Sequence, residues 1–115
     1  MAISLVAYAR GLDKPTSDIY VEKKAIRRDS YQESGVKVDV CEETYRFCDG
    51  VVLRRLIEID DVCAALESEG VCAECWISYE VLDSAGIDIQ PKCKVFSNTC
   101  QMRFWLRMGD LSTTA

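Results

Sequence analysis

Residues 36–59 read VKVDVCEETYRFCDGVVLRRLIEI, and this stretch decides the fold. Over residues 36–40, three valines alternate with charged residues, which places the valines on one face of a strand. Asp49-Gly50 then indicates a tight hairpin turn in which both residues adopt positive φ. The sequence therefore predicts two antiparallel strands joined by this turn, with the second strand over residues 51–59.

The second strand has a helical alternative. Its apolar residues also recur at alternating steps of four and three, the spacing of one helical face: Val52, Leu56, Ile59, Cys63 and Leu66. One long helix would then begin at Asp49 and end at Gly70. The high content of Val and Ile favours the strand. We therefore expect a strand to Ile59, followed by a short helix over residues 61–69.

The flanking segments predict further strands over residues 3–9, 20–26, 71–81, 87–90 and 92–96, with loops over residues 11–18 and 30–35. A last strand is predicted over residues 100–108. In it, Cys100, Met102, Phe104, Leu106 and Met108 alternate with Gln101, Arg103, Trp105 and Arg107. Because most connections are short, we expect a single α+β domain over residues 1–115. It would be a mainly antiparallel β-sandwich or partly open barrel of six to seven strands with one helix. Residues 1–2 and 110–115 are expected to be flexible.

The composition limits the compartment and the partners. The chain has 115 residues and a formal net charge of −5, so nucleic-acid phosphate is disfavoured as a ligand. No apolar run approaches the roughly 18–20 residues that span a bilayer. No signal-peptide pattern opens the sequence. We therefore expect a cytoplasmic protein without membrane contact, in the host cytoplasm if the chain is viral.

The sequence has seven cysteines and no histidine. Free cysteines buried as small hydrophobic residues are the favoured interpretation, because Cys63, Cys75 and Cys100 fall on predicted apolar faces. A disulfide framework is a second interpretation, which leaves at least one sulfur unpaired within the chain. A zinc site is a third, with the ligands Cys72, Cys75, Cys93 and Cys100. No cofactor is expected otherwise.

The absence of histidine excludes the Ser-His-Asp triad and the Cys-His pair. No glycine-rich phosphate-binding motif is present. An acid–base pair of carboxylates is the remaining catalytic option, drawn from Glu42-Glu43, Asp60-Asp61 or Glu67 and Glu69. With nineteen acidic residues such pairs arise by chance, so we expect a protein that is not an enzyme.

The segment that suggests a function is Arg103-Phe104-Trp105-Leu106-Arg107. On a strand, Arg103, Trp105 and Arg107 form an exposed row, and Trp and Arg are enriched at binding hot spots. The leading hypothesis is a protein–protein interaction module, such as a viral or phage inhibitor or a subunit of a homo-oligomer. The alternative is a single-stranded nucleic-acid binder, in which the row joins four basic residues: Lys23, Lys24, Arg27 and Arg28.

Overall fold

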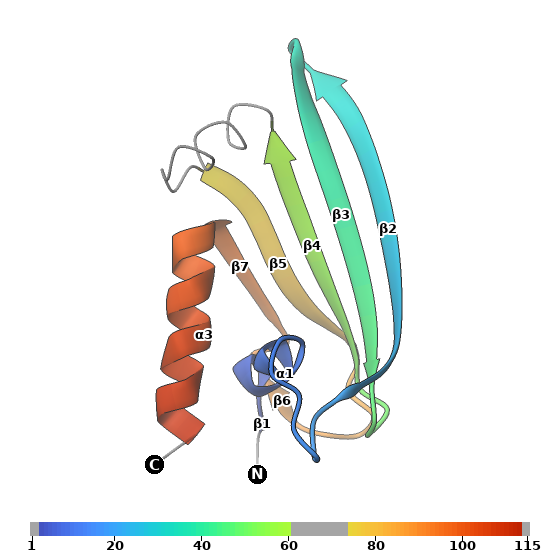
Figure 1. Cartoon of the computed structure of the whole chain (residues 1–115), viewed down its shortest axis with the longest axis vertical. Coiled ribbons are helices and arrows are strands. Elements are labelled where there is room, and N and C mark those ends of the chain that lie inside the picture. The colour runs from blue at the N-terminus through green and yellow to red at the C-terminus, as the bar shows by residue number, and fades with distance from the viewer. Residues whose placement is uncertain (1–2, 61–73, 114–115) are drawn as a thin grey trace.

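One curved sheet of five antiparallel strands dominates the computed structural model, which describes residues 3–60 and 74–113 (Figure 1). The strands are ordered β2-β3-β4-β5-β7 across the sheet. Their bounds are β2 Val21–Glu33, β3 Val36–Phe47, β4 Val52–Asp60, β5 Glu74–Asp83 and β7 Cys93–Asn98. Strands β2 and β7 are therefore the two edges of this sheet.

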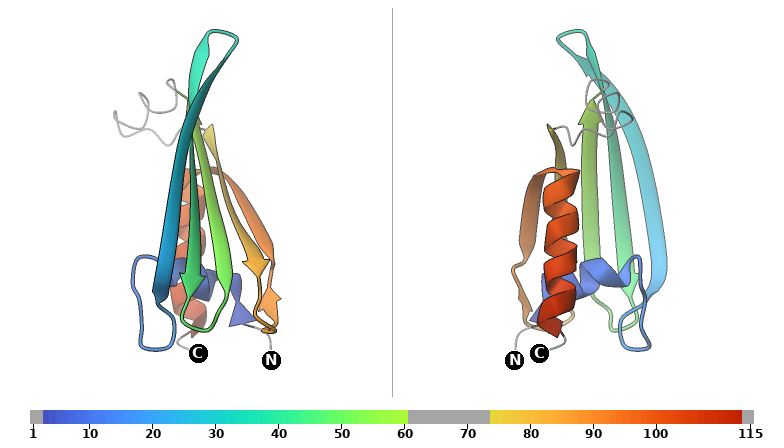
Figure 2. Two further views of the ribbon diagram at one scale, coloured as in Figure 1. Left: turned by 90° about the vertical axis from the view of Figure 1, so that its right-hand side faces the viewer. Right: turned by 60° about the vertical axis from the view of Figure 1, so that its left-hand side comes forward.

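Two helices cover one face of the sheet: α1 (Leu5–Gly11) and α3 (Thr99–Thr113). Both views of Figure 2 show them on the same side. A small parallel pair, β1 (Ile3–Ser4) with β6 (Ile89–Gln90), lies beside α1 (Figure 1). The predicted α+β class and the mainly antiparallel pairing are confirmed. The prediction of one helix is wrong, since the described residues hold two, and these helices form the second layer.

The hairpin predicted at Asp49-Gly50 is confirmed, and residues 52–60 return as a strand rather than as part of a long helix. The turn differs from the prediction, because only Gly50 has a positive φ, at 94°. The Phe47 N–H donates to the Val51 carbonyl at 2.8 Å, which closes a loop of three residues. Such loops need only their last residue in the left-handed region. The helix predicted over residues 61–69 lies outside the described residues.

The loop predicted over residues 30–35 is wrong, because β2 continues to Glu33. Ser34 and Gly35 both have positive φ, at 53° and 79°, and form a two-residue turn. This turn lets β2 and β3 pair along their whole length. Residues 27–40, the outer part of this hairpin, are called the arm below, and the rest of the described chain is called the body. The outer end of the arm extends beyond the ends of β4 and β5 (Figure 1), whereas residues 38–40 still pair with β4.

The two terminal predictions are also wrong. Residues 3–9 were expected to form a strand, but the chain turns into α1 after Ser4. Residues 100–108 were expected to form the last strand, but they lie in α3, which continues through the expected tail to Thr113. Asn98 explains the start of α3, because its side-chain Oδ1 accepts the N–H of Gln101 at 2.8 Å. Asn-x-x-Gln is a helix N-terminal signal that outweighs the alternation of apolar residues.

The core fills the space between the sheet and both helices. Trp105 and Leu106 of α3 pack against a cluster of buried residues. These residues are Leu5, Tyr8, Ala9, Tyr45, Phe47, Val51, Leu53, Ile77, Tyr79, Ile89 and Phe96. The other side of the sheet is called the open face below, since no described element covers it. Trp76 and Leu82 lie on that face and are each 48% exposed.

Candidate functional site

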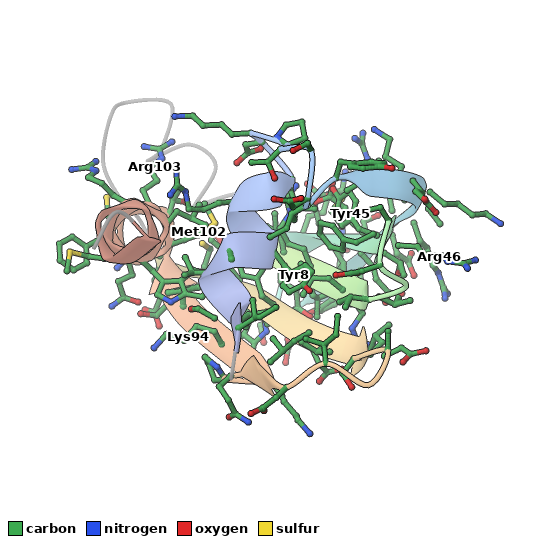
Figure 3. The ribbon with its side chains drawn as sticks, turned by 90° about the horizontal axis from the view of Figure 1, so that it is seen from below. Tyr8, Tyr45, Arg46, Lys94, Met102 and Arg103 are labelled. Atoms are coloured by element: carbon green, nitrogen blue, oxygen red, sulfur yellow. The ribbon has the colours of Figure 1, made fainter. Side chains whose placement is uncertain are left out.

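The Arg-Trp-Arg row predicted over residues 103–107 does not form. These residues lie on α3, and successive helical residues point about 100° apart around the axis. Trp105 is half-buried, with its ring centroid 5.5 Å from that of Tyr79 and 5.2 Å from that of Phe96. Arg103 and Arg107 are exposed and share a different face of the helix. In Figure 3, which looks along α3, Met102 lies on the side toward the rest of the protein.

The four basic residues of β2 are exposed, but they do not join α3. Lys23 and Arg27 lie on the open face of the sheet, whereas Lys24 and Arg28 lie on the side of the helices. Because β2 is one edge of the sheet and α3 packs near β7 at the other edge (Figure 1), the combined basic and aromatic platform is absent. The prediction that these seven residues form one surface is therefore wrong.

The structure shows a different surface along α3, a groove of about 510 Å³ between this helix and β7. Its walls are Lys94, Val95, Phe96, Gln101, Phe104, Trp105 and Met108. The four helical members recur at steps of three, one and three, the spacing of one helical face. Phe104 is 62% exposed and Met108 is 47% exposed, which is unusual for apolar side chains of this size. We call this surface the α3–β7 groove.

An open strand edge borders the α3–β7 groove. Among the described residues β7 pairs with β5 alone, so its other side has no strand partner. The Ser97 N–H of this strand donates to the Gln101 side chain at 2.9 Å. Most of β7 is exposed, and Phe96 alone is buried, where it packs on Trp105. Lys94 lies over the Phe96 ring, with Nζ 5.9 Å from the centroid. The groove thus combines backbone hydrogen-bonding groups, an apolar floor and one cation.

Sequence reasoning identified Trp105 but missed Phe104 and Met108. The predicted strand assigned those two side chains to the buried face, whereas the helix exposes them. The Asn98-x-x-Gln101 signal was present in the sequence. With a helix begun there, the spacing of residues 101, 104, 105 and 108 would have placed all four on one face.

A buried charge cluster lies at the centre of the body. The Glu43 side chain, 12% exposed, accepts a hydrogen bond from Arg55 Nε at 2.7 Å and one from the Tyr45 hydroxyl at 2.6 Å. Burial lowers the pKa of Arg55, but its hydrogen bonds with Tyr79 and Glu43 outweigh this effect and raise it. Burial and the bond to Glu43 raise the pKa of Tyr45 to about 12. These groups form hydrogen bonds with one another, which is typical of a buried polar cluster that stabilises the fold.

The carboxylate pairs considered for catalysis find no support in this geometry. Glu42 and Glu43 lie on opposite faces of β3, and Glu43 is neutralised by Arg55. Asp60 ends β4, while Asp61, Glu67 and Glu69 lie outside the described residues. That the protein is not an enzyme stays a prediction.

The cysteines differ in their state. Cys41, Cys48, Cys75 and Cys93 form no disulfide, whereas Cys100 is disulfide-bonded. Cys75 is half-buried and packs against the core, as expected. For Cys100 the expectation of a buried free thiol is wrong, since this residue is exposed on the first turn of α3.

The zinc site is not formed as predicted. A sulfur in a disulfide is not a thiolate, so Cys100 is not available as a ligand. Cys93 lies opposite Glu80 in the sheet, five residues along β5 from Cys75. Cys72 lies outside the described residues, as does Cys63. Within the described ranges, no group of three or more Cys, Asp or Glu side chains is arranged to hold a metal ion.

Comparison with known proteins finds no match among protein-family models, curated proteins or solved structures. In the part of the chain that the structure describes, neither helix combines the length and the hydropathy of a membrane span.

Proposed function

We propose that this protein is a non-catalytic interaction module that captures an extended segment of a partner protein in the α3–β7 groove. The observation that carries the proposal is the open edge of β7 beside exposed Phe104 and Met108. An added strand forms backbone hydrogen bonds with such an edge, and pockets beside the edge select its side chains. This combination suits a peptide better than a flat protein surface.

The groove specifies the chemistry of its occupant. Side chains of an added strand point alternately to the two faces of the sheet, so every second one enters the groove. Phe104, Trp105 and Met108 favour large apolar side chains there, and methionine adapts to several shapes. Lys94 favours an Asp or Glu near one end. The proposed ligand is an extended segment with alternating apolar residues and one carboxylate.

Single-stranded nucleic acid fits the molecule less well. Stacking platforms for bases need aromatic rings within a basic groove. Here the groove that holds the aromatic rings has Lys94 as its one basic wall residue, and the basic residues of β2 lie at the other edge of the sheet. The net charge of −5 adds repulsion.

The cytoplasmic location also stays a prediction. The disulfide at Cys100 weighs against it, because reducing compartments keep thiols free.

The test selects a phage-displayed library of linear peptides on the purified protein. We expect enriched sequences to alternate apolar residues and to carry an acidic residue. Synthetic copies are then titrated by fluorescence anisotropy. Phe104→Ala and Met108→Ala should each weaken binding about tenfold, the loss typical of an interface anchor. Leu82→Ala is the matched control, because Leu82 is 48% exposed on the open face, outside the groove.

Three outcomes are informative. Loss of binding in the groove variants, with the control unchanged, supports the proposal. Peptides that bind the groove variants as tightly as the natural protein would overturn it, and so would a selection without enrichment. Circular dichroism of each variant shows whether the fold is intact, which is expected because both side chains are largely exposed.

A further inference from the structure

The second edge of the sheet is longer and more exposed than the first. Strand β2 has 13 residues, and all of them except Val21 are exposed. In the described chain β2 pairs only with β3, so its outer side presents free backbone groups. Natural proteins protect such edges from one another, most often with charged residues. The charges of β2 therefore indicate which partners its edge accepts.

These charges are divided between the two halves of the strand. On the open face the first half presents Lys23 and Arg27, and the second half presents Asp29 and Glu33. Strand β3 neutralises only one of the four, since Arg27 lies opposite Glu42. Lys23 lies opposite another cation, and the two carboxylates lie opposite valines. Three charges on this face thus have no opposite charge directly across from them in their own hairpin.

We propose that β2 pairs antiparallel with β2 of a second copy of this chain, about a twofold axis at Arg28. Antiparallel pairing brings the basic half of one strand against the acidic half of the other. Lys23 then lies opposite Glu33 of the second copy, and Arg27 lies opposite Asp29. The axis repeats both pairs, so each of the four charges gains an opposite partner. The two sheets become one continuous sheet, with the helices of both copies on the same side.

Symmetry leaves few alternatives to this register. A twofold axis that keeps the same face of both sheets on one side passes through a residue that lies opposite itself. Axes at Arg27 or Asp29 form no opposite-charge pair on the open face. An axis at Ile26 forms only the pair of Lys23 with Asp29, and an axis at Ser30 forms only the pair of Arg27 with Glu33. The axis at Arg28 forms both pairs and also covers Ile26 and Tyr31, which are 46% and 45% exposed. This register also brings the two Arg28 side chains close together at the axis, where their like charges repel each other.

The backbone hydrogen bonds and the covered apolar area supply the attraction, and the charges select the register. Exposed ion pairs contribute little each, and salt screens them. The dimer should therefore be weak and should dissociate as the salt concentration rises. An edge with charges of one sign would repel its own copy under all conditions. The divided charge of β2 favours this register because shifted registers form fewer opposite-charge pairs.

Charge reversal in two separate variants provides the test. The first variant is Lys23→Glu/Arg27→Glu, which makes all four positions acidic. The second is Asp29→Lys/Glu33→Lys, which makes all four basic. Sedimentation velocity at low salt and high protein concentration should show self-association of the natural protein. Each variant alone should associate at least about tenfold more weakly, since like charges face each other.

The decisive sample is an equal mixture of the two variants. In the proposed register, every charged position of one variant lies opposite a position of the other with the opposite sign, so the mixture should form a dimer. Lys14→Glu/Lys92→Glu is the control, because it changes the net charge equally at exposed sites outside β2 and should dimerise as the natural protein does. Arg28→Ala should strengthen the dimer by removing the repulsion at the axis.

Two results would overturn the proposal. One is a natural protein that stays monomeric at low salt up to its solubility limit. The other is a mixture that associates no better than either variant alone. Both are distinct from a failure of peptide binding, because the α3–β7 groove lies at the other edge of the sheet.

Discussion

The body and the arm share strand β3, yet the same strand is held in two different ways. In the body, Tyr45 and Phe47 of β3 belong to the buried core cluster and are 7% and 0% exposed. In the arm, Lys37 and Asp39 of β3 are exposed, and so is every residue of the paired segment of β2. Burial therefore stabilises the body, whereas backbone pairing and a two-residue turn order the arm. A surface that contributes little to folding is free to serve binding.

The largest expected difference is between a core residue and an arm residue. Phe47→Ala should lower the free energy of unfolding by about 3–5 kcal/mol, since Phe47 is fully buried and its loss leaves a cavity. Tyr31→Ala should change it by less than about 0.5 kcal/mol, because Tyr31 is 45% exposed. Urea unfolding followed by circular dichroism measures both. The protein is kept dilute to prevent self-association.

This pair of variants tests whether the arm contributes less to folding than the body. Equal losses for Tyr31→Ala and Phe47→Ala would show that the arm carries as much of the folding free energy as the body. The exposed arm would then be a structural element, and its availability for binding would no longer follow.

A second pair of variants compares a buried and an exposed ion pair on adjacent residues of β4. Arg55 pairs with Glu43 at 2.7 Å, with the two side chains 19% and 12% exposed. Arg54 pairs with Glu80 at 2.8 Å on the open face, with 35% and 40% exposed. Arg55→Met should cost about 3 kcal/mol, because it leaves a buried carboxylate unpaired. Arg54→Met should cost at most about 1 kcal/mol.

The same urea measurement decides between the two faces of the sheet. If Arg54→Met costs as much as Arg55→Met, the open face contributes to stability through its charges, and the body is not held by one face alone. A small loss for both variants would mean that the Glu43 carboxylate finds another partner or becomes neutral.

The strands of the hairpin could be predicted because their local signals agree with one another. Alternation over residues 36–40, the Asp49-Gly50 turn and the Val and Ile of β4 all indicate antiparallel pairing. The signal did not indicate which face is covered. The three valines of the alternation lie on the open face and are only half-buried. Covering is decided by α1 and α3, which come from distant parts of the chain.

The prediction of a C-terminal strand failed because the residues of this segment fit both the period of a strand and the period of a helix. Met102, Phe104, Leu106 and Met108 alternate as in a strand, but Met102, Trp105 and Leu106 are also neighbours on a helix and pack on the core. Their side chains are mostly good helix formers, and Asn98 begins a helix. The groove could not be predicted, since it needs β7 and α3 side by side. The choice of Cys100 for a disulfide likewise depends on three-dimensional proximity.

The smallest expected effect concerns the tyrosine of the buried cluster, and it appears with pH. The pKa of Tyr45 rises from the ordinary value of 10.0 to about 12, first because of burial and then because its hydroxyl donates to Glu43. Between these two values the unfolded chain has lost a proton that the folded protein retains. Stability from Tyr45 is therefore fully present below pH 10.0 and is lost as the pH rises through about 12.

Tyr45→Phe removes this dependence along with one hydrogen bond. At neutral pH the variant should be less stable by about 1 kcal/mol, since Glu43 loses one of its donors. Above pH 10.0 its stability should fall less steeply than that of the natural protein. Tyr20→Phe is the control, because Tyr20 is 41% exposed and should leave the slope unchanged. A steep alkaline loss that persists in Tyr45→Phe would assign the dependence to Tyr8 or Tyr79, whose pKa values burial also raises.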